Sequence, residues 1–166
     1  MDLSTAEAEV LALADALRRR GWHLATAESC TGGLIAAACT AVAGSSDWFE
    51  RGFVTYSNGA KQEMLGVDPA LIAAHGAVSQ AVACAMARGA VERAGVELSV
   101  AVTGIAGPGG ATPGKPVGTV WLALAWRGAS GELQLQAERL QLDGDRAAVR
   151  EQTVRRALQR LREAAA

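Results

Sequence analysis

Two short segments of the chain, residues 28–33 and 56–61, carry side chains that could together cleave an amide. The first contains the hydroxyl of Ser29, and the second contains the phenol of Tyr56 and the amine of Lys61. A hydroxyl nucleophile, an amine base and backbone N–H donors for an oxyanion form a known amidase arrangement. If the fold brings these segments together, the sequence predicts a site for hydrolytic chemistry.

Ser29 has two interpretations from its local sequence. It lies between the strand-like residues 22–24 and the apolar, helix-like residues 34–38, where Ser is a preferred helix cap. The same position would set a hydroxyl beside the unpaired N–H groups of a helix N-terminus, which favour anions. Gly32 and Gly33 would let a ligand approach the backbone closely. Both interpretations are open from this segment alone.

Lys61 suits the role of a base, and Cys30 competes with Ser29 for the role of nucleophile. An amine held away from bulk water near a helix N-terminus has a lowered pKa, as a base working near neutral pH requires. Thiols are intrinsically good nucleophiles at neutral pH. Neighbours in a helix point about 100° apart, so Ser29 and Cys30 cannot both face one carbonyl.

A third segment, beginning at Thr103, is rich in glycine and runs on to Lys115 and Pro116. The glycines that could line a ligand are Gly104, Gly107, Gly109 and Gly110. The spacing that ends at Lys115 resembles the start of a P-loop, but Pro116 stands where a hydroxyl should hold magnesium, and a strand follows. The segment is therefore not an ATPase loop. A sharply turning surface loop and a ligand-binding loop are both open.

Composition excludes several classes of protein. The 166 residues carry a net charge of −1, which does not suggest a nucleic-acid surface. There is no apolar run long enough for a membrane span, and the N-terminal acids do not suit a signal peptide. Three cysteines are an odd number without paired spacing, which predicts reduced thiols in a cytoplasm. Two histidines without neighbouring acids or thiols predict no metal site.

Helical and strand periodicities alternate along the chain. They predict an α/β fold in which residues 1–166 form a single domain, a three-layer α/β/α sandwich with a mixed sheet. Ligands collect where the strands of such sheets end. The predicted helices cover residues 4–20, about 30–42, 58–66, a short stretch from 68, 79–94 and a last helix from 144. The predicted strands lie near residues 22–27, 51–57, 97–103, 117–126 and 132–140, the last two forming a hairpin.

Several longer sequence blocks, spread in order over residues 5–163, together form a recognisable family pattern. They are residues 27–33, 56–58 with Lys61, 65–67, 76–79, 103–110 with 115–120, and 144–146 with 149–150. This pattern resembles the CinA C-terminal domain family. The resemblance implies a nicotinamide-nucleotide amidohydrolase that needs no cofactor and converts nicotinamide mononucleotide and water to nicotinate mononucleotide and ammonia in pyridine-nucleotide salvage. Longer relatives carry a further N-terminal domain, so the chain is similar to the stand-alone form.

The resemblance also implies roles for residues. The family's nucleophile falls on Ser29 and its base on Lys61, with Tyr56 alongside as a proton relay or a positioning group. Glu28 is expected to orient the loop rather than to act as an acid. The residues expected near the substrate are Glu28, Cys30, Thr31, Gly32, Gly33, Asn58, Thr103, Gly104, Gly107, Gly109, Gly110 and Arg146.

Three questions stay open. A non-catalytic pyridine-nucleotide-binding module would use the same loops, although binding alone does not require Ser29 together with Lys61. Arg146 and Arg150 would suit a phosphate, but they also fit an ordinary solvated helix face. Apolar residues such as Trp48 favour self-association, and we expect a homodimer or a larger homo-oligomer.

Overall fold

Five strands form one mixed sheet at the centre of the computed structural model, which describes residues 6–166. The strand order is β2-β1-β3-β4-β5; the first three strands run parallel, and β4 and β5 pair antiparallel. The strands are β1 (Leu24–Glu28), β2 (Phe49–Val54), β3 (Leu98–Gly104), β4 (Thr119–Arg127) and β5 (Leu133–Gln141). Every residue of β1 is buried, as expected for an inner parallel strand.

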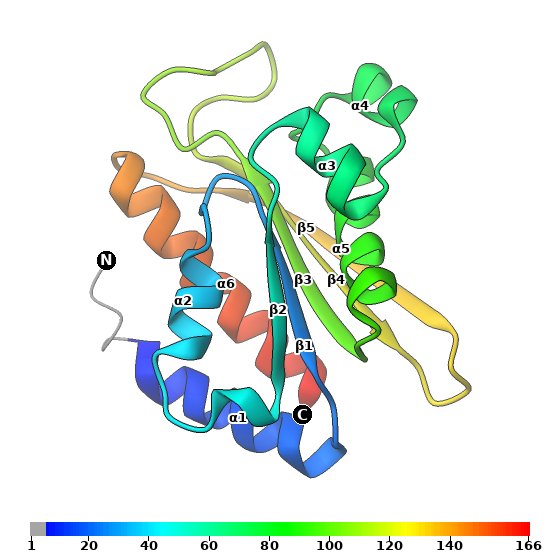
Figure 1. The fold of residues 1–166 in the computed structure, drawn as a ribbon. Coiled ribbons are helices and arrows are strands. Elements are labelled where there is room, and N and C mark those ends of the chain that lie inside the picture. The colour runs from blue at the N-terminus through cyan, green and yellow to red at the C-terminus, as the bar shows by residue number, and fades with distance from the viewer. Residues whose placement is uncertain (1–5) are drawn as a thin grey trace.

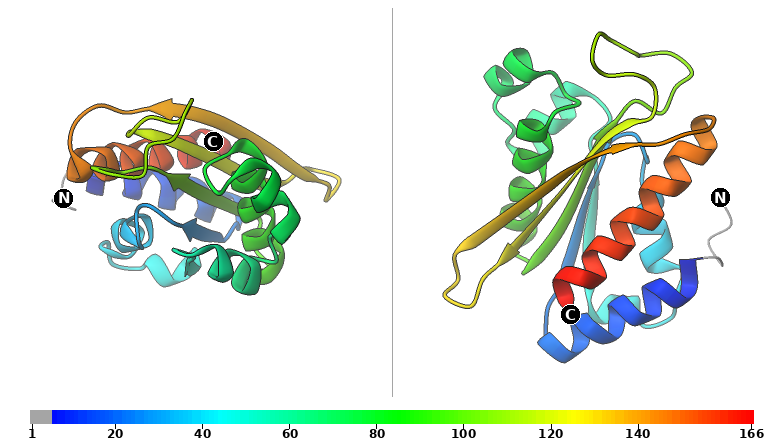
Figure 2. Two further views of the ribbon diagram at one scale, coloured as in Figure 1. Left: turned by 90° about the horizontal axis from the view of Figure 1, so that it is seen from above. Right: turned by 180° about the vertical axis from the view of Figure 1, so that it is seen from behind.

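Helices cover both faces of the sheet (Figures 1 and 2). One face packs against α1 (Glu7–Arg20), α2 (Leu34–Thr40) and α6 (Arg146–Ala165), and the other against α3 (Asn58–Leu65), α4 (Pro69–His75) and α5 (Gln80–Ala94). Each face has its own hydrophobic core. The predicted three-layer α/β/α sandwich with a mixed sheet is confirmed.

Several predicted boundaries are wrong in detail. The helix predicted from about residue 30 begins at Leu34, because Gly32 (φ 60°) and Gly33 (φ 100°) have left-handed backbone angles that interrupt a right-handed helix. The strand predicted over 51–57 ends at Val54, and Ser57 instead caps α3. The predicted start of the first helix at residue 4 lies outside the described residues.

The chemistry-bearing segments meet at one end of the sheet. The turn after β1, the start of α3 and the long loop between β3 and β4 all lie at this end, beside the first residues of α6 (Figure 1). The three parallel strands point their carboxyl ends here, which is where ligands collect in such sheets.

None of the helices in residues 6–166 is both long and apolar enough to cross a membrane.

Candidate active site

The fold brings Ser29 and Lys61 into contact. Lys61 Nζ lies 3.1 Å from Ser29 Oγ, and it donates a second hydrogen bond of 2.9 Å to the carbonyl oxygen of Thr55. Both side chains are largely withdrawn from water, since Ser29 is 9% exposed and Lys61 only 1%. The pair spans 32 positions in sequence and joins the end of β1 to α3.

The position of Lys61 is set by how α3 is held at both ends. At its start, the Ser57 hydroxyl accepts a hydrogen bond from Ala60 N and caps the helix. Near its end, α3 lies so close to α5 that a Cβ on Gly89 would collide with the backbone of Leu65. Lys61 and Leu65 are one helical turn apart and are both buried. The close seating of α3 on α5 therefore fixes the depth at which Lys61 enters the site.

The surroundings of Lys61 favour its neutral amine. Burial lowers the pKa of the Lys61 ammonium, because removing a charge from water disfavours it. Within residues 6–166, Lys61 takes part in no ion pair that would hold the proton in place. An amine of this kind can accept a proton near neutral pH.

The turn that carries Ser29 is anchored by the carboxylate of Glu28. This fully buried group accepts hydrogen bonds from Thr31 Oγ1 at 2.6 Å and from the N–H groups of Ile35 and Ala36 at 2.9 and 3.0 Å. The carboxylate thus satisfies free N–H groups at the start of α2. Glu28 thus holds the turn against the start of α2, and both of its oxygens face that helix. Thr31 is likewise fully buried and donates to Glu28.

Arg150 holds the same turn from the other side. Its guanidinium donates to the carbonyl oxygens of Cys30 and Thr31 at 3.2 and 3.1 Å. Cys30 is 6% exposed, and burial raises the pKa of its thiol to about 11. A thiol with that pKa is almost wholly protonated near neutral pH and is a weak nucleophile. Neither Ser29 nor Cys30 lies in a helix, so the predicted helical geometry for the two residues is wrong.

Arg146 joins Tyr56 to the glycine-rich loop. It donates to Tyr56 Oη and to the carbonyl oxygen of Gly107, both at 2.9 Å. Tyr56 is 61% exposed, and its hydroxyl bonds with Arg146 rather than with Lys61.

Beside the bridge made by Arg146 lies a cavity of about 660 Å³, mostly apolar, whose walls include Ala106, Pro108, Val117, Arg146 and Arg150. Arg150 lines this cavity and also holds the turn that carries Ser29, although neither Ser29 nor Lys61 is itself part of the lining.

The remaining predicted residues fall into three groups. Thr103 is 1% exposed and donates to the Ala77 carbonyl, and Gly104 packs against Val120 at the end of β3, so both act in the scaffold. Asn58 at the start of α3 and the loop glycines Gly109 and Gly110 are exposed at the same end of the sheet. Gly32 and Gly33 shape the turn after Ser29 through their left-handed backbone angles.

Two contributions escaped the sequence analysis. The Thr55 carbonyl that binds Lys61 is a backbone atom, and no side-chain pattern could have indicated it. Arg150 was expected to contact either a phosphate or solvent, whereas its fork binds the turn of the nucleophile. Its position one helical turn after Arg146 was the only signal that both could face the site.

Among the residues that the structure describes, no three His, Cys, Asp or Glu side chains gather in a way that could hold a metal ion.

Comparison with known proteins identifies the relatives of this chain. The model of the CinA C-terminal domain matches residues 6–165. A Pseudomonas putida protein named nicotinamide-nucleotide amidohydrolase PncC is 56% identical over 146 residues, which cover 88% of each chain. A CinA-like protein of Citrifermentans bemidjiense is 58% identical over 150 residues, which cover 90% of this chain but 35% of the relative. The chain thus spans about a third of the length of several relatives it matches.

A solved structure has the same fold. The crystal structure of a CinA superfamily protein from Klebsiella pneumoniae superimposes with a TM-score of 0.90 at 41% identity, covering 96% of this chain and 97% of the other.

Proposed function

The chain belongs to the CinA C-terminal domain family, and from that premise we propose that it is a nicotinamide-nucleotide amidohydrolase. Its substrate is nicotinamide mononucleotide, and its products are nicotinate mononucleotide and ammonia. The observation that carries the proposal is the buried contact between Ser29 and Lys61, in which burial lowers the pKa of the amine. A relative with that name, matched over 88% of its own length, supports the choice of substrate.

The first half-reaction forms an ester on Ser29. Neutral Lys61 accepts the hydroxyl proton as Ser29 Oγ attacks the carboxamide carbon. In the turn, Gly32 N–H already donates to the Ser29 carbonyl at 3.1 Å, and another backbone N–H of residues 30–33 is proposed to hold the oxyanion. Protonated Lys61 then gives its proton to the departing nitrogen, and ammonia leaves.

The second half-reaction releases the acid. A water molecule gives a proton to Lys61 and attacks the ester carbon, and Ser29 Oγ leaves and regains its proton from Lys61. The Thr55 carbonyl retains one N–H of Lys61 throughout, which keeps the nitrogen aimed at Ser29. Since Tyr56 bonds with Arg146, we assign it to positioning rather than to proton relay.

The nucleotide part of the substrate fits the cavity of about 660 Å³ beside the nucleophile turn. Its apolar wall suits the pyridine ring and the ribose carbons, and Arg146 is the cation placed to bind the 5′-phosphate. Arg150 holds the turn that carries Ser29, so we assign it to the turn and the phosphate to Arg146, whose own hydrogen bonds go to Tyr56 and to the Gly107 carbonyl. The proposal includes a cytoplasmic location and a homodimer or larger assembly, and light scattering of the purified protein tests the latter.

A non-catalytic nucleotide-binding module is the second candidate, and one experiment separates the two. The purified protein is incubated with nicotinamide mononucleotide in EDTA, and ammonia and nicotinate mononucleotide are measured. We expect equal amounts of both products, and EDTA leaves the rate unchanged because the dyad needs no metal. Binding of nicotinamide mononucleotide without turnover would favour the non-catalytic module. Activity that EDTA abolishes and one divalent ion restores would replace the Ser–Lys mechanism with a metal-activated water.

A further inference from the structure

A second, smaller cavity is lined by residues 113–115 of the glycine-rich loop, whereas Ala106, Pro108 and Val117 line the proposed catalytic pocket. Its volume is about 290 Å³, and its lining includes His75, Ser79, Lys115, Trp121 and Arg139. None of these residues belongs to the Ser29–Lys61 site. The cavity is formed where the end of α4 and the start of α5 face the loop and the hairpin of β4 and β5.

The charge of this cavity is positive and uncompensated. Lys115 and Arg139 both line it, and the lining contains no Asp or Glu. In the described part of the chain, neither cation takes part in an ion pair. Instead, Lys115 Nζ donates to the His75 carbonyl at 2.9 Å and Arg139 to the Gly114 carbonyl at 2.7 Å. These bonds hold two cations at the cavity while leaving their charge for an anion.

An aromatic ring lies beside the cations. Trp121 of β4 pairs directly with Arg139 of β5 across the antiparallel ladder, so the two side chains are neighbours on one face of the sheet. A half-buried indole offers a stacking surface to a planar base, and an arginine fork binds phosphate oxygens through two hydrogen bonds.

We propose that this cavity binds a nucleoside monophosphate, with its base against Trp121 and its phosphate on Arg139 and Lys115. The volume lies just below the usual range for small-molecule sites, which favours a mononucleotide over a dinucleotide. The ligand would contact the loop at Lys115, while the same loop offers Gly107 to Arg146 in the catalytic pocket. The two pockets therefore share one loop.

Isothermal titration of the wild-type protein with AMP tests the site, because AMP carries no carboxamide and cannot be turned over by an amidase. We expect one equivalent to bind and the affinity to fall as salt rises. Arg139→Gln should weaken binding about tenfold or more, and Trp121→Leu should weaken it as well. Arg127→Gln is the matched control, since it removes an exposed arginine from the far end of the same hairpin. Thermal melts of all three variants confirm that each is folded.

Several results would overturn the proposal. AMP that does not bind at millimolar concentration, or that binds equally well to Arg139→Gln, contradicts it. If Arg146→Ala weakens AMP binding and Arg139→Gln does not, the nucleotide occupies the catalytic pocket instead. If inorganic phosphate binds as tightly as AMP, the ring contributes nothing and the assignment to a nucleotide is wrong. Failure of the amidase assay alone leaves this titration unaffected, so the two proposals fail separately.

Discussion

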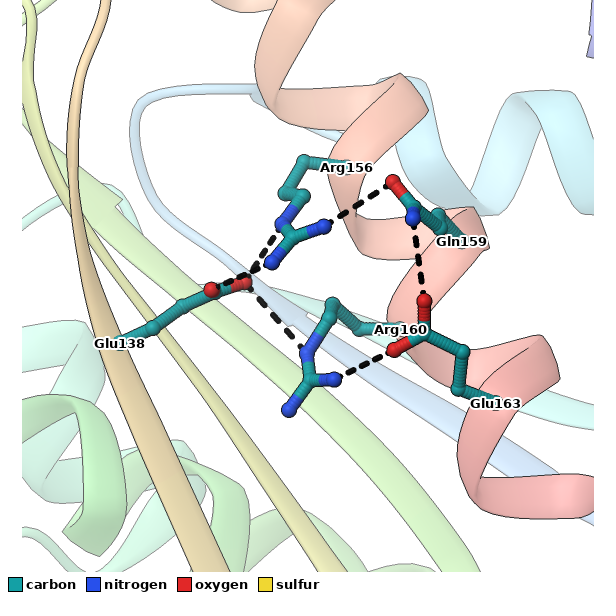
Figure 3. A network of polar contacts seen from close by, with 5 residues as sticks. All are labelled: Glu138, Arg156, Gln159, Arg160 and Glu163. Carbon is teal, nitrogen blue, oxygen red and sulfur yellow. Dashed lines mark hydrogen bonds and ion pairs between the residues drawn. The ribbon is translucent and has the colours of Figure 1, made fainter.

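Lys61 and two arginines of α6, Arg156 and Arg160, are basic side chains in two regions of one small protein, but their partners and their burial differ. Arg156 donates to both carboxylate oxygens of Glu138 at 2.8 and 2.7 Å, and Arg160 lies 3.5 Å from the same carboxylate and also pairs with Glu163 (Figure 3). Hydrogen bonding to Glu138 raises the pKa of the Arg156 guanidinium. Lys61 meets only a hydroxyl and a carbonyl, and burial lowers its pKa.

The difference separates a structural cation from a reactive one. A carboxylate partner holds the proton on Arg156, so that network can fasten β5 to α6 but cannot exchange protons near neutral pH. A neutral oxygen partner leaves Lys61 free to lose its proton and to take one from Ser29. A buried amine without a carboxylate partner thus distinguishes the proposed reactive site from the structural network.

The largest expected effect is on turnover. Ser29→Ala and Lys61→Ala should each lower kcat by about 10³-fold or more, and the double variant should be little worse, because nucleophile and base act as a unit. Lys61→Arg should not restore activity, since a guanidinium stays protonated. Arg156→Gln is the matched control and should retain kcat. Steady-state kinetics give kcat for each variant, and thermal melts check that each variant is folded. Near-normal turnover in Ser29→Ala together with loss in Cys30→Ala would move the nucleophile by one residue.

A smaller effect should distinguish the two arginines that line the catalytic cavity. Arg150→Ala frees the turn of Ser29 and should lower kcat by about tenfold or more, because misplacing a nucleophile slows the reaction steeply. Arg146→Ala should raise KM with less change in kcat, since a phosphate contact is made in both ground and transition states. Steady-state kinetics of both variants, with kcat and KM determined separately, measure the difference. An unchanged KM in Arg146→Ala would assign the phosphate to the glycine-rich loop.

The smallest effect concerns stability and its dependence on pH. The pKa of Lys61 is lower in the folded than in the unfolded chain, so folding releases a proton between the lowered value and the free lysine value of about 10.4. Wild-type stability relative to Lys61→Met should therefore rise with pH in that window, by about 1.4 kcal/mol for each unit of the shift.

Glu138→Gln provides the contrast to Lys61→Met. Glu138→Gln should lower the free energy of unfolding by about 1 kcal/mol or less, because the ion-pair network of Glu138 is partly exposed and solvent screens it. That cost should not change over the same alkaline window, since an arginine keeps its proton there. Denaturant titrations of the three proteins at several pH values measure both effects. A stability difference for Lys61→Met that does not change with pH would mean that the amine is not perturbed.

The sequence predicts the layers of this fold because periodicity reports which face of each element is buried. It also predicts which strand ends carry the polar groups, since Ser29 directly follows β1 and Lys61 lies in the helix that follows β2. It does not predict the start of α2, where the backbone angles of Gly32 and Gly33 override an alanine-rich helical pattern. The role of Thr55 depends on a main-chain oxygen, and that of Arg150 on carbonyls 119 and 120 positions away, so neither follows from local pattern.

The central claim is that neutral Lys61 activates Ser29, and the pH dependence of kcat/KM for nicotinamide mononucleotide tests it most directly. This parameter reports groups that titrate in the free enzyme. The account predicts that kcat/KM rises with pH to a plateau, with an apparent pKa below the value of about 10.4 for free lysine. The Glu138→Gln variant should show the same profile. An active enzyme whose kcat/KM shows no such rise, or a rise that persists in Lys61→Ala, would contradict the assignment of Lys61 as the base.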